Sequence, residues 1–193
     1  MNRQSISALR RVGIAAGVAA LAAAGGGVAA GATVSDTAAT APAAVATCAT
    51  SQLQIWYGQP ASGTAGSVYF PLEFSNTGST SCVLDGYPGV SGVGDGGVQL
   101  GSSATWNPVI TPSEVVLTPG GTAHVILRVT DVGNYPASTC EPTQAIGLRI
   151  YPPNQTASVV VSYSFEACAK AGDNYLAVDA VNSGVGIPFY TSS

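Results

Sequence analysis

Four cysteines, Cys48, Cys82, Cys140 and Cys168, have the chemistry that is easiest to assign in this chain. Cysteines form disulfides or bind metals, and zinc ligands usually come as closely spaced Cys or His pairs. These four are widely separated in the sequence, so we predict disulfides and no metal site. Sequence alone leaves every pairing of the four open. Since the two sequential pairs are local, we predict bridges from Cys48 to Cys82 and from Cys140 to Cys168.

Acid–base chemistry has few candidate residues. His124 is the single histidine, so a Ser-His-Asp arrangement would need it as the base. It lies in an alternating run that turns it outward, and we interpret it as a solvated strand residue. No spacing marks any carboxylate pair for glycoside hydrolysis. We therefore expect no catalytic residue and no cofactor, with a cell-wall hydrolase of unrecognised type as the alternative. The candidate carboxylates for hydrolysis are Glu73, Asp85, Asp95, Glu114, Asp131, Glu141, Glu166, Asp173 and Asp179.

Three aromatic residues, Trp56, Tyr57 and Trp106, are the candidates for ligand binding. Aromatic faces stack on sugar rings or anchor protein interfaces, and these three are expected near strand ends or in a loop. The other interpretation is that each of them closes the hydrophobic core. Tyr87, in a Gly-Tyr-Pro-Gly sequence, is expected to be a packed corner residue. The partner that fits these residues is an envelope protein or a glycan of unknown identity.

The elements that would position these residues are β-strands. In 68–74, Val68, Phe70, Leu72 and Phe74 share one face, which predicts a strand with one buried side. Pro71 cannot donate to a strand ladder, so we expect this strand at a sheet edge or bulged there. The same alternation in 122–131 turns His124 and Arg128 outward. A third inward face is formed by Val159, Val161, Tyr163 and Phe165.

Turn residues separate the apolar runs and favour antiparallel connections. Pro and Gly mark turns at 75–80, 118–122 and 151–156, the last of these a predicted hairpin. No run predicts an amphipathic helix longer than two turns. We predict an all-β fold, a two-sheet immunoglobulin-like β-sandwich that is antiparallel and disulfide-stapled, with a jelly roll or barrel as the alternative. The remaining strand candidates are Leu53–Tyr57, Cys82–Leu84, Gly97–Leu100, Glu114–Leu117, Ile146–Tyr151 and Tyr175–Val181.

Residues 1–32 are typical of an export signal, with basic residues, then an apolar stretch, then small residues ending at Ala32. Cleavage after Ala32 is predicted, and cleavage after Ala46 is the alternative. The apolar stretch is shorter than the ~20 residues that span a bilayer, so no stable membrane insertion is expected after cleavage. Residues 33–47, rich in Ala, Thr and Pro, predict a flexible tether, and 48–193 the β-sandwich domain. We expect a secreted protein, associated with the cell wall or free, in an oxidising compartment.

The charge of the mature chain excludes one class of partner. Removing residues 1–32 leaves Arg128, Arg149 and Lys170 against ten acidic residues, a net charge of −7. Nucleic-acid binding depends on clustered Lys and Arg, which this chain lacks. We therefore expect no nucleic-acid partner.

Several motifs together resemble a known family. They are Leu72–Gly78, Cys82–Val90, Val116–Gly121, Leu148–Pro153 and the four cysteines, and the Cys-x-Leu-x-Gly-Tyr-Pro-Gly-Val run at 82–90 is the distinctive part. From about Cys48 to Val181 the chain resembles the exported actinobacterial family of domain of unknown function 4232. The resemblance implies an exported β-sandwich, often behind a tether or lipid anchor, and brings no established activity or catalytic residues. Thr47 precedes Cys48 where a lipid-attachment motif requires a small residue, so no lipid anchor is expected here.

Overall fold

A computed structural model describes residues 44–59, 62–64, 66–109 and 111–186 of the chain. The predicted signal and the predicted tether up to residue 43 lie outside these residues. Among the described residues, no helix is long and apolar enough to cross a membrane.

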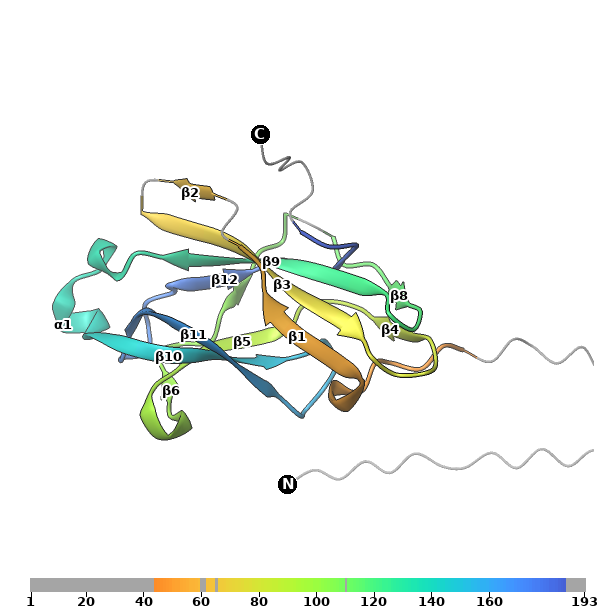
Figure 1. Cartoon of the computed structure of the whole chain (residues 1–193). Coiled ribbons are helices and arrows are strands. Elements are labelled where there is room, and N and C mark those ends of the chain that lie inside the picture. The colour runs from red at the N-terminus through yellow and green to blue at the C-terminus, as the bar shows by residue number, and fades with distance from the viewer. Residues whose placement is uncertain (1–43, 60–61, 65, 110, 187–193) are drawn as a thin grey trace, which may run out of the picture. The chain divides into compact units, whose positions relative to one another are not determined.

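The larger sheet is built around β3 (Ser67–Asn76) and β9 (Thr122–Thr130), which pair antiparallel along almost their whole length (Figure 1). β1 (Leu53–Tyr57) and β2 (Ser62–Thr64) pair in succession with the other edge of β3. On the far edge of β9 lie β12 (Leu176–Val178) and β13 (Asn182–Ser183). β7 (Thr105–Trp106) extends the sheet beyond β12 in a parallel pairing. The order is therefore β1-β3-β9-β12-β7.

The smaller sheet has the order β11-β10-β5-β6, formed by β11 (Val159–Cys168), β10 (Pro142–Tyr151), β5 (Gly89–Val93) and β6 (Gln99–Leu100). The predicted hairpin at 151–156 joins β10 to β11. A separate pair is formed by β4 (Cys82–Leu84) and β8 (Val115–Leu117). The short helices are η1 (Thr50–Gln52), η2 (Asp95–Gly97), η3 (Val132–Asn134) and α1 (Ala137–Cys140).

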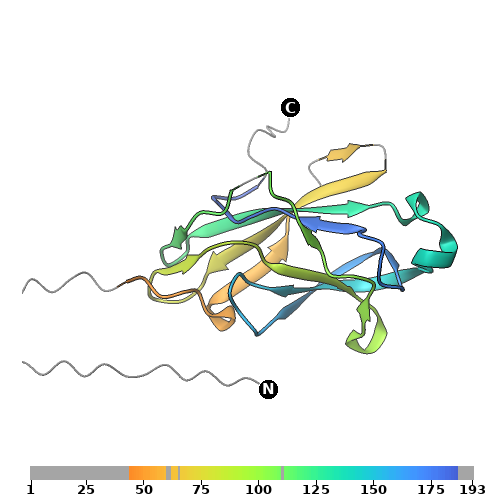
Figure 2. The ribbon, with the colours of Figure 1, turned by 180° about the vertical axis from the view of Figure 1, so that it is seen from behind.

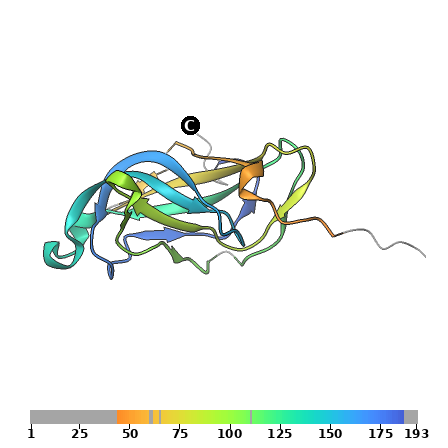
Figure 3. The same ribbon diagram turned by 90° about the horizontal axis from the view of Figure 1, so that it is seen from below.

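The two sheets pack face to face as a β-sandwich (Figure 3). β1 contacts β11 at the side nearest the viewer in Figure 1, and β12 contacts β5 at the side seen from behind in Figure 2. The inner face of the β3–β9 pair is fully buried at Phe70, Leu72, Phe74, Val125 and Leu127, as the alternation predicted. The predicted sandwich is confirmed, and the sheets do not close into a barrel.

Pro71 lies in a central strand that pairs with β9 without a register shift, so the prediction that its strand forms a sheet edge or is bulged there is wrong. The pairing explains how the sheet accepts this residue. The Pro71 carbonyl accepts a hydrogen bond from Gly58 N, just after β1 has ended at Tyr57. In an antiparallel strand the N and the C=O of one residue point to the same side. The missing N–H therefore faces the break between β1 and β2, where no ladder donor is required.

Both predicted disulfides are present, Cys48–Cys82 and Cys140–Cys168, and no cysteine is free. The first joins the segment before β1 to β4, and the second joins the end of α1 to the end of β11. All four cysteines are buried. The last residues of the predicted tether also pair with the domain, since Val83 N donates to Ala46 O and Thr47 forms a bridge with Val83.

The Cys140–Cys168 bridge is expected to contribute strongly to stability. The double variant Cys140→Ser/Cys168→Ser should lower the free energy of unfolding by about 2 to 5 kcal/mol, because the unfolded chain gains the freedom of the opened loop. A domain of this size then melts several degrees lower. Thermal unfolding monitored by circular dichroism, with the exposed Ser138→Ala as the control, measures the difference. An unchanged melting temperature in the double variant would contradict this role of the bridge.

Candidate functional site

Trp106 is the most exposed of the predicted ligand-binding aromatic residues, with 65% of its surface accessible. It lies on the edge strand β7, which hydrogen bonds hold against β12. Asn107 N donates to the Val178 carbonyl, and Thr105 Oγ1 donates to the Leu176 carbonyl. The indole lies flat against the ring of Tyr87, with 5.0 Å between ring centroids and 8° between ring planes. The result is an exposed, stacked aromatic pair at the edge of the larger sheet.

Tyr87 is half-buried, so it is only partly the packed corner residue that the sequence predicts. Its loop is fixed on one side by Gly86, whose φ of 97° is the left-handed conformation that glycine favours, and whose carbonyl accepts from Val181 N. On the other side Pro88 is buried. A rigid loop therefore holds the ring on which Trp106 stacks.

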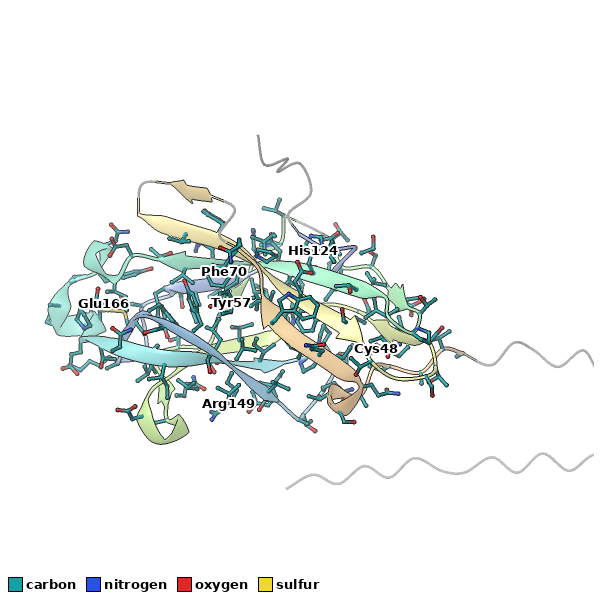
Figure 4. All side chains as sticks on the ribbon, viewed as in Figure 1. Cys48, Tyr57, Phe70, His124, Arg149 and Glu166 are labelled. Atoms are coloured by element: carbon teal, nitrogen blue, oxygen red, sulfur yellow. A yellow bond between two sulfur atoms is a disulfide. The ribbon has the colours of Figure 1, made fainter. Side chains whose placement is uncertain are left out.

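Trp56 and Tyr57 are consecutive residues of β1 and point to opposite faces of the sheet. Tyr57 faces the smaller sheet, where its ring lies 4.9 Å from that of Tyr163. Its ring also lies 6.1 Å from that of Phe70, and Figure 4 labels both of these residues. Trp56 is half-buried on the outer face. The three predicted aromatic residues thus lie on three separate surfaces, and the structure does not bring them together in one site.

The outer face carries a row of side chains that the sequence analysis did not group. Direct cross-strand partners place Trp56 beside Glu73, Glu73 beside His124, and His124 beside Asn182, across β1, β3, β9 and β13. Neighbours in such a row lie about 5 Å apart and interact. A carboxylate and an imidazole are therefore adjacent near the middle of the sheet.

Glu73 and His124 are buried, with exposed fractions of 4% and 1%. The C-terminal segment covers them: Gly186 N donates to Glu73 Oε1 at 2.7 Å, and the Gly184 carbonyl lies 3.1 Å from His124 Nδ1. Because a carbonyl only accepts, Nδ1 carries the proton. The prediction that His124 faces outward is correct, but the prediction that it is solvated is wrong, since β13 and the residues after it lie over it.

Burial raises the pKa of the Glu73 carboxyl above its ordinary value. The hydrogen bond from Gly186 and the positive charge of His124 oppose this shift without cancelling it. Glu73 Oε2 is buried and has no hydrogen-bond partner. A general base must reach its substrate, and the C-terminal segment separates this pair from solvent. The Glu73–His124 pair thus holds the C-terminal segment on the sheet and is closed to a substrate.

A second polar group on the same face joins Asn107 and Asp179, whose side chains are hydrogen-bonded at 2.7 Å. Burial raises the pKa of the Asp179 carboxyl, while Asn107 and the charge of Arg128 act against this. The cavity beside them is about 70 Å³, room for about two water molecules. It is too small to be a ligand site.

One group of side chains in the described part of the chain is a candidate for metal binding. Among the described residues, the one cluster with the spacing of a metal site is Cys140, Cys168 and Asp173. Its two sulfurs are joined in a disulfide, so they are not thiolate ligands.

Two of the candidate carboxylates, Asp131 and Glu166, line a larger cleft between the sheets.

Comparison with known proteins identifies a family by its sequence model. The model described as domain of unknown function (DUF4232) matches residues 48–182, which cover the described β-sandwich from the first cysteine to β13. A search of the curated proteins finds no match.

The raised pKa of Glu73 predicts how stability depends on pH. The folded state releases this proton at a higher pH than the unfolded state, whose value is near 4.5, so the carboxyl lowers stability as pH rises above that value. In Glu73→Gln this contribution is absent. The melting temperature of Glu73→Gln minus that of the wild type should therefore increase between about pH 4 and about pH 7. Glu114→Gln, at an exposed carboxylate, should show no such trend, and a Glu73→Gln difference that stays constant with pH would exclude this interpretation.

Proposed function

The chain belongs to the DUF4232 family, which carries no activity with it, and we propose that its mature domain is an exported, non-catalytic binding module of the cell envelope. The Ala- and Gly-rich N-terminal segment with its basic residues supports export. The two buried disulfides fit an oxidising compartment. The ligand is a neutral glycan or an envelope protein, bound at the exposed aromatic pair of Trp106 and Tyr87.

The exposure of Trp106 is the observation that carries this proposal. A large indole exposed at a sheet edge offers an apolar anchor to a partner, and Trp is among the residues enriched at binding hot spots. Stacking on Tyr87 already restricts the indole. A ligand therefore binds to a surface that is ordered in advance and loses less side-chain entropy.

The shape and charge of the surface favour certain ligand classes. The Trp106 indole lies parallel to the Tyr87 ring and keeps its outer side free, which is a flat apolar face of the kind that stacks on the face of a sugar ring or on a planar side chain. The net charge of −7 expected for the mature chain disfavours polyanions, which includes nucleic acids. Neutral glycans and proteins with a weakly charged or basic surface remain, and a binding panel separates these two classes.

The alternative, a cell-wall hydrolase, requires an accessible acid–base pair. Glu73 and His124 are covered by the C-terminal segment. Asp131 and Glu166 are exposed in the inter-sheet cleft, and Asp131 Oδ1 also accepts a hydrogen bond from Gly133 N at 2.8 Å. That two acidic residues line one accessible cleft is the observation that favours the alternative, and turnover measurements decide between the two functions.

Trp106→Ala is expected to weaken ligand binding by about thirtyfold or more, because truncation at a hot spot lowers the binding free energy by at least about 2 kcal/mol. The panel consists of peptidoglycan fragments, neutral glycans and envelope proteins, with affinity measured by calorimetry. Tyr151→Ala removes an exposed aromatic residue of the other sheet and is the matched control. Trp56→Ala tests the outer face.

The proposed binding site and the proposed non-catalytic function are tested by different outcomes. A ligand whose affinity is unchanged in Trp106→Ala, with the fold intact by circular dichroism, rules out the aromatic pair as the site. Turnover of a panel member that is lost in Asp131→Asn or Glu166→Gln rules out the non-catalytic function.

A further inference from the structure

One end of the sandwich contains a cleft of about 420 Å³ between the two sheets. Its floor is the cross-strand pair Val68–Val129 of β3 and β9. Its roof is formed by Tyr163 and Phe165 of β11. Figure 4 shows Glu166, which follows Phe165, at this end of the molecule. The volume lies within the range of about 300 to 1,000 Å³ that small-molecule sites occupy.

The cleft is open because no core side chain covers Val68. Val68 faces inward like the fully buried Phe70, yet 38% of its surface is exposed. Its cross-strand neighbour on β2 is Gly63, which has no side chain to cover it. A Cβ added at Gly63 would meet no atom within 4 Å. The space beside Val68 is therefore open because residue 63 is a glycine. A larger side chain at this position would not clash with the surrounding structure.

The aromatic roof is held in place by its neighbours. Tyr163 lies against Phe165 with 5.2 Å between centroids, and against Phe70 and Tyr57 with 4.9 Å in each case. Such a cluster restricts ring motion and keeps the cleft from collapsing. Its rings also present the negative faces that attract cations.

The rim of the cleft is acidic. Asp131 and Glu166 line it, and among the described lining residues there is no Lys, Arg or His. The rim is anchored, because Asp131 N and Asn134 Nδ2 both donate to the Gly66 carbonyl. Although the Asp131 carboxylate caps η3 through Gly133 N, it has further lone pairs for a ligand. An apolar interior behind two carboxylates is complementary to a positive charge carried on an apolar body.

We propose that this cleft binds a small organic cation, an ammonium group attached to an aromatic or alkyl body. The body packs between the Val68–Val129 floor and the Tyr163–Phe165 roof, and the ammonium lies at the rim near Asp131 and Glu166. The ring faces add a cation–π attraction. The net negative charge of the domain attracts such a ligand at long range.

This site is independent of the one proposed at Trp106. The cleft involves β2, β3, β9 and β11, whereas Trp106 lies on β7, beyond β12. The two proposals therefore make different predictions for the same variants. Trp106→Ala should leave the cleft intact, and variants of the cleft should leave the stacked aromatic pair intact.

The probe is 2-phenylethylammonium, compared with the neutral 2-phenylethanol and the anionic phenylacetate, added to the purified protein. Binding is followed by calorimetry and by chemical-shift changes of the Val68 and Val129 methyl groups. We expect saturable binding of the cation that weakens with added salt, and affinities for the alcohol and the carboxylate lower by about tenfold or more. Equal affinity for the cation and the alcohol would refute the proposed charge recognition.

Two kinds of variant locate the site. Asp131→Asn/Glu166→Gln removes the charge while Asn still caps η3, and it should weaken cation binding by about tenfold or more. Gly63→Val narrows the cleft beside Val68 and should weaken binding by about tenfold or more without lowering the melting temperature. Glu114→Gln and Trp106→Ala should bind as the wild type does. Wild-type affinity in a folded Gly63→Val variant would overturn the proposed site.

Discussion

The antiparallel ladder between β3 and β9 determines where every surface of this protein lies. It runs from Ser67↔Thr130 to Ser75↔Thr122 without a register shift. Because side chains alternate along both strands, this single register places the core on one face and the Glu73–His124 pair on the other. The end of the same ladder leaves Val68 and Val129 as the floor of the cleft, and its outer edges accept β1 and β12. A slip of one residue would exchange the two faces.

The disulfides fix segments of the chain that this ladder does not hold. Cys48–Cys82 anchors the chain just before η1 and β1, and Cys140–Cys168 anchors the connection between η3 and the smaller sheet. Both lie outside the β3–β9 pair, where loops enter and leave the sandwich. They therefore cross-link parts of the sandwich that the β3–β9 ladder does not reach, the β4–β8 pair and the end of the smaller sheet.

Local patterns predicted the elements whose sequence alternates. β1 and β4 have the predicted boundaries, and the inward faces of β3 and β9 follow the parity of their apolar residues. β5 was missed because its Gly-rich sequence lacks that signal. Its Gly92 is required by a distant residue, since a Cβ there would lie 2.6 Å from Tyr175 Oη.

The candidate sites depended on contacts between distant parts of the chain, and the sequence predicted them less well. The burial of His124 and Glu73 follows from the C-terminal segment, whose position no local pattern encodes. Val68 has the alternation of a core residue, and only its pairing with Gly63 leaves it open to solvent. The stacking of Trp106 on Tyr87 likewise joins the strand β7 to the loop before β5, and these two segments are not neighbours in the sequence.

The cover over Glu73 and His124 also bears on how the protein folds. When β3 and β9 have paired but Asn182–Gly186 has not yet docked, the larger sheet is incomplete. In that state β9 has a free edge beside His124, a place where other chains can pair. The ionisable side chains of Glu73 and His124 next to such an edge stay hydrated and oppose association between incompletely folded chains. The last residues of the domain then remove this polar patch from water, and the finished sheet no longer offers that edge.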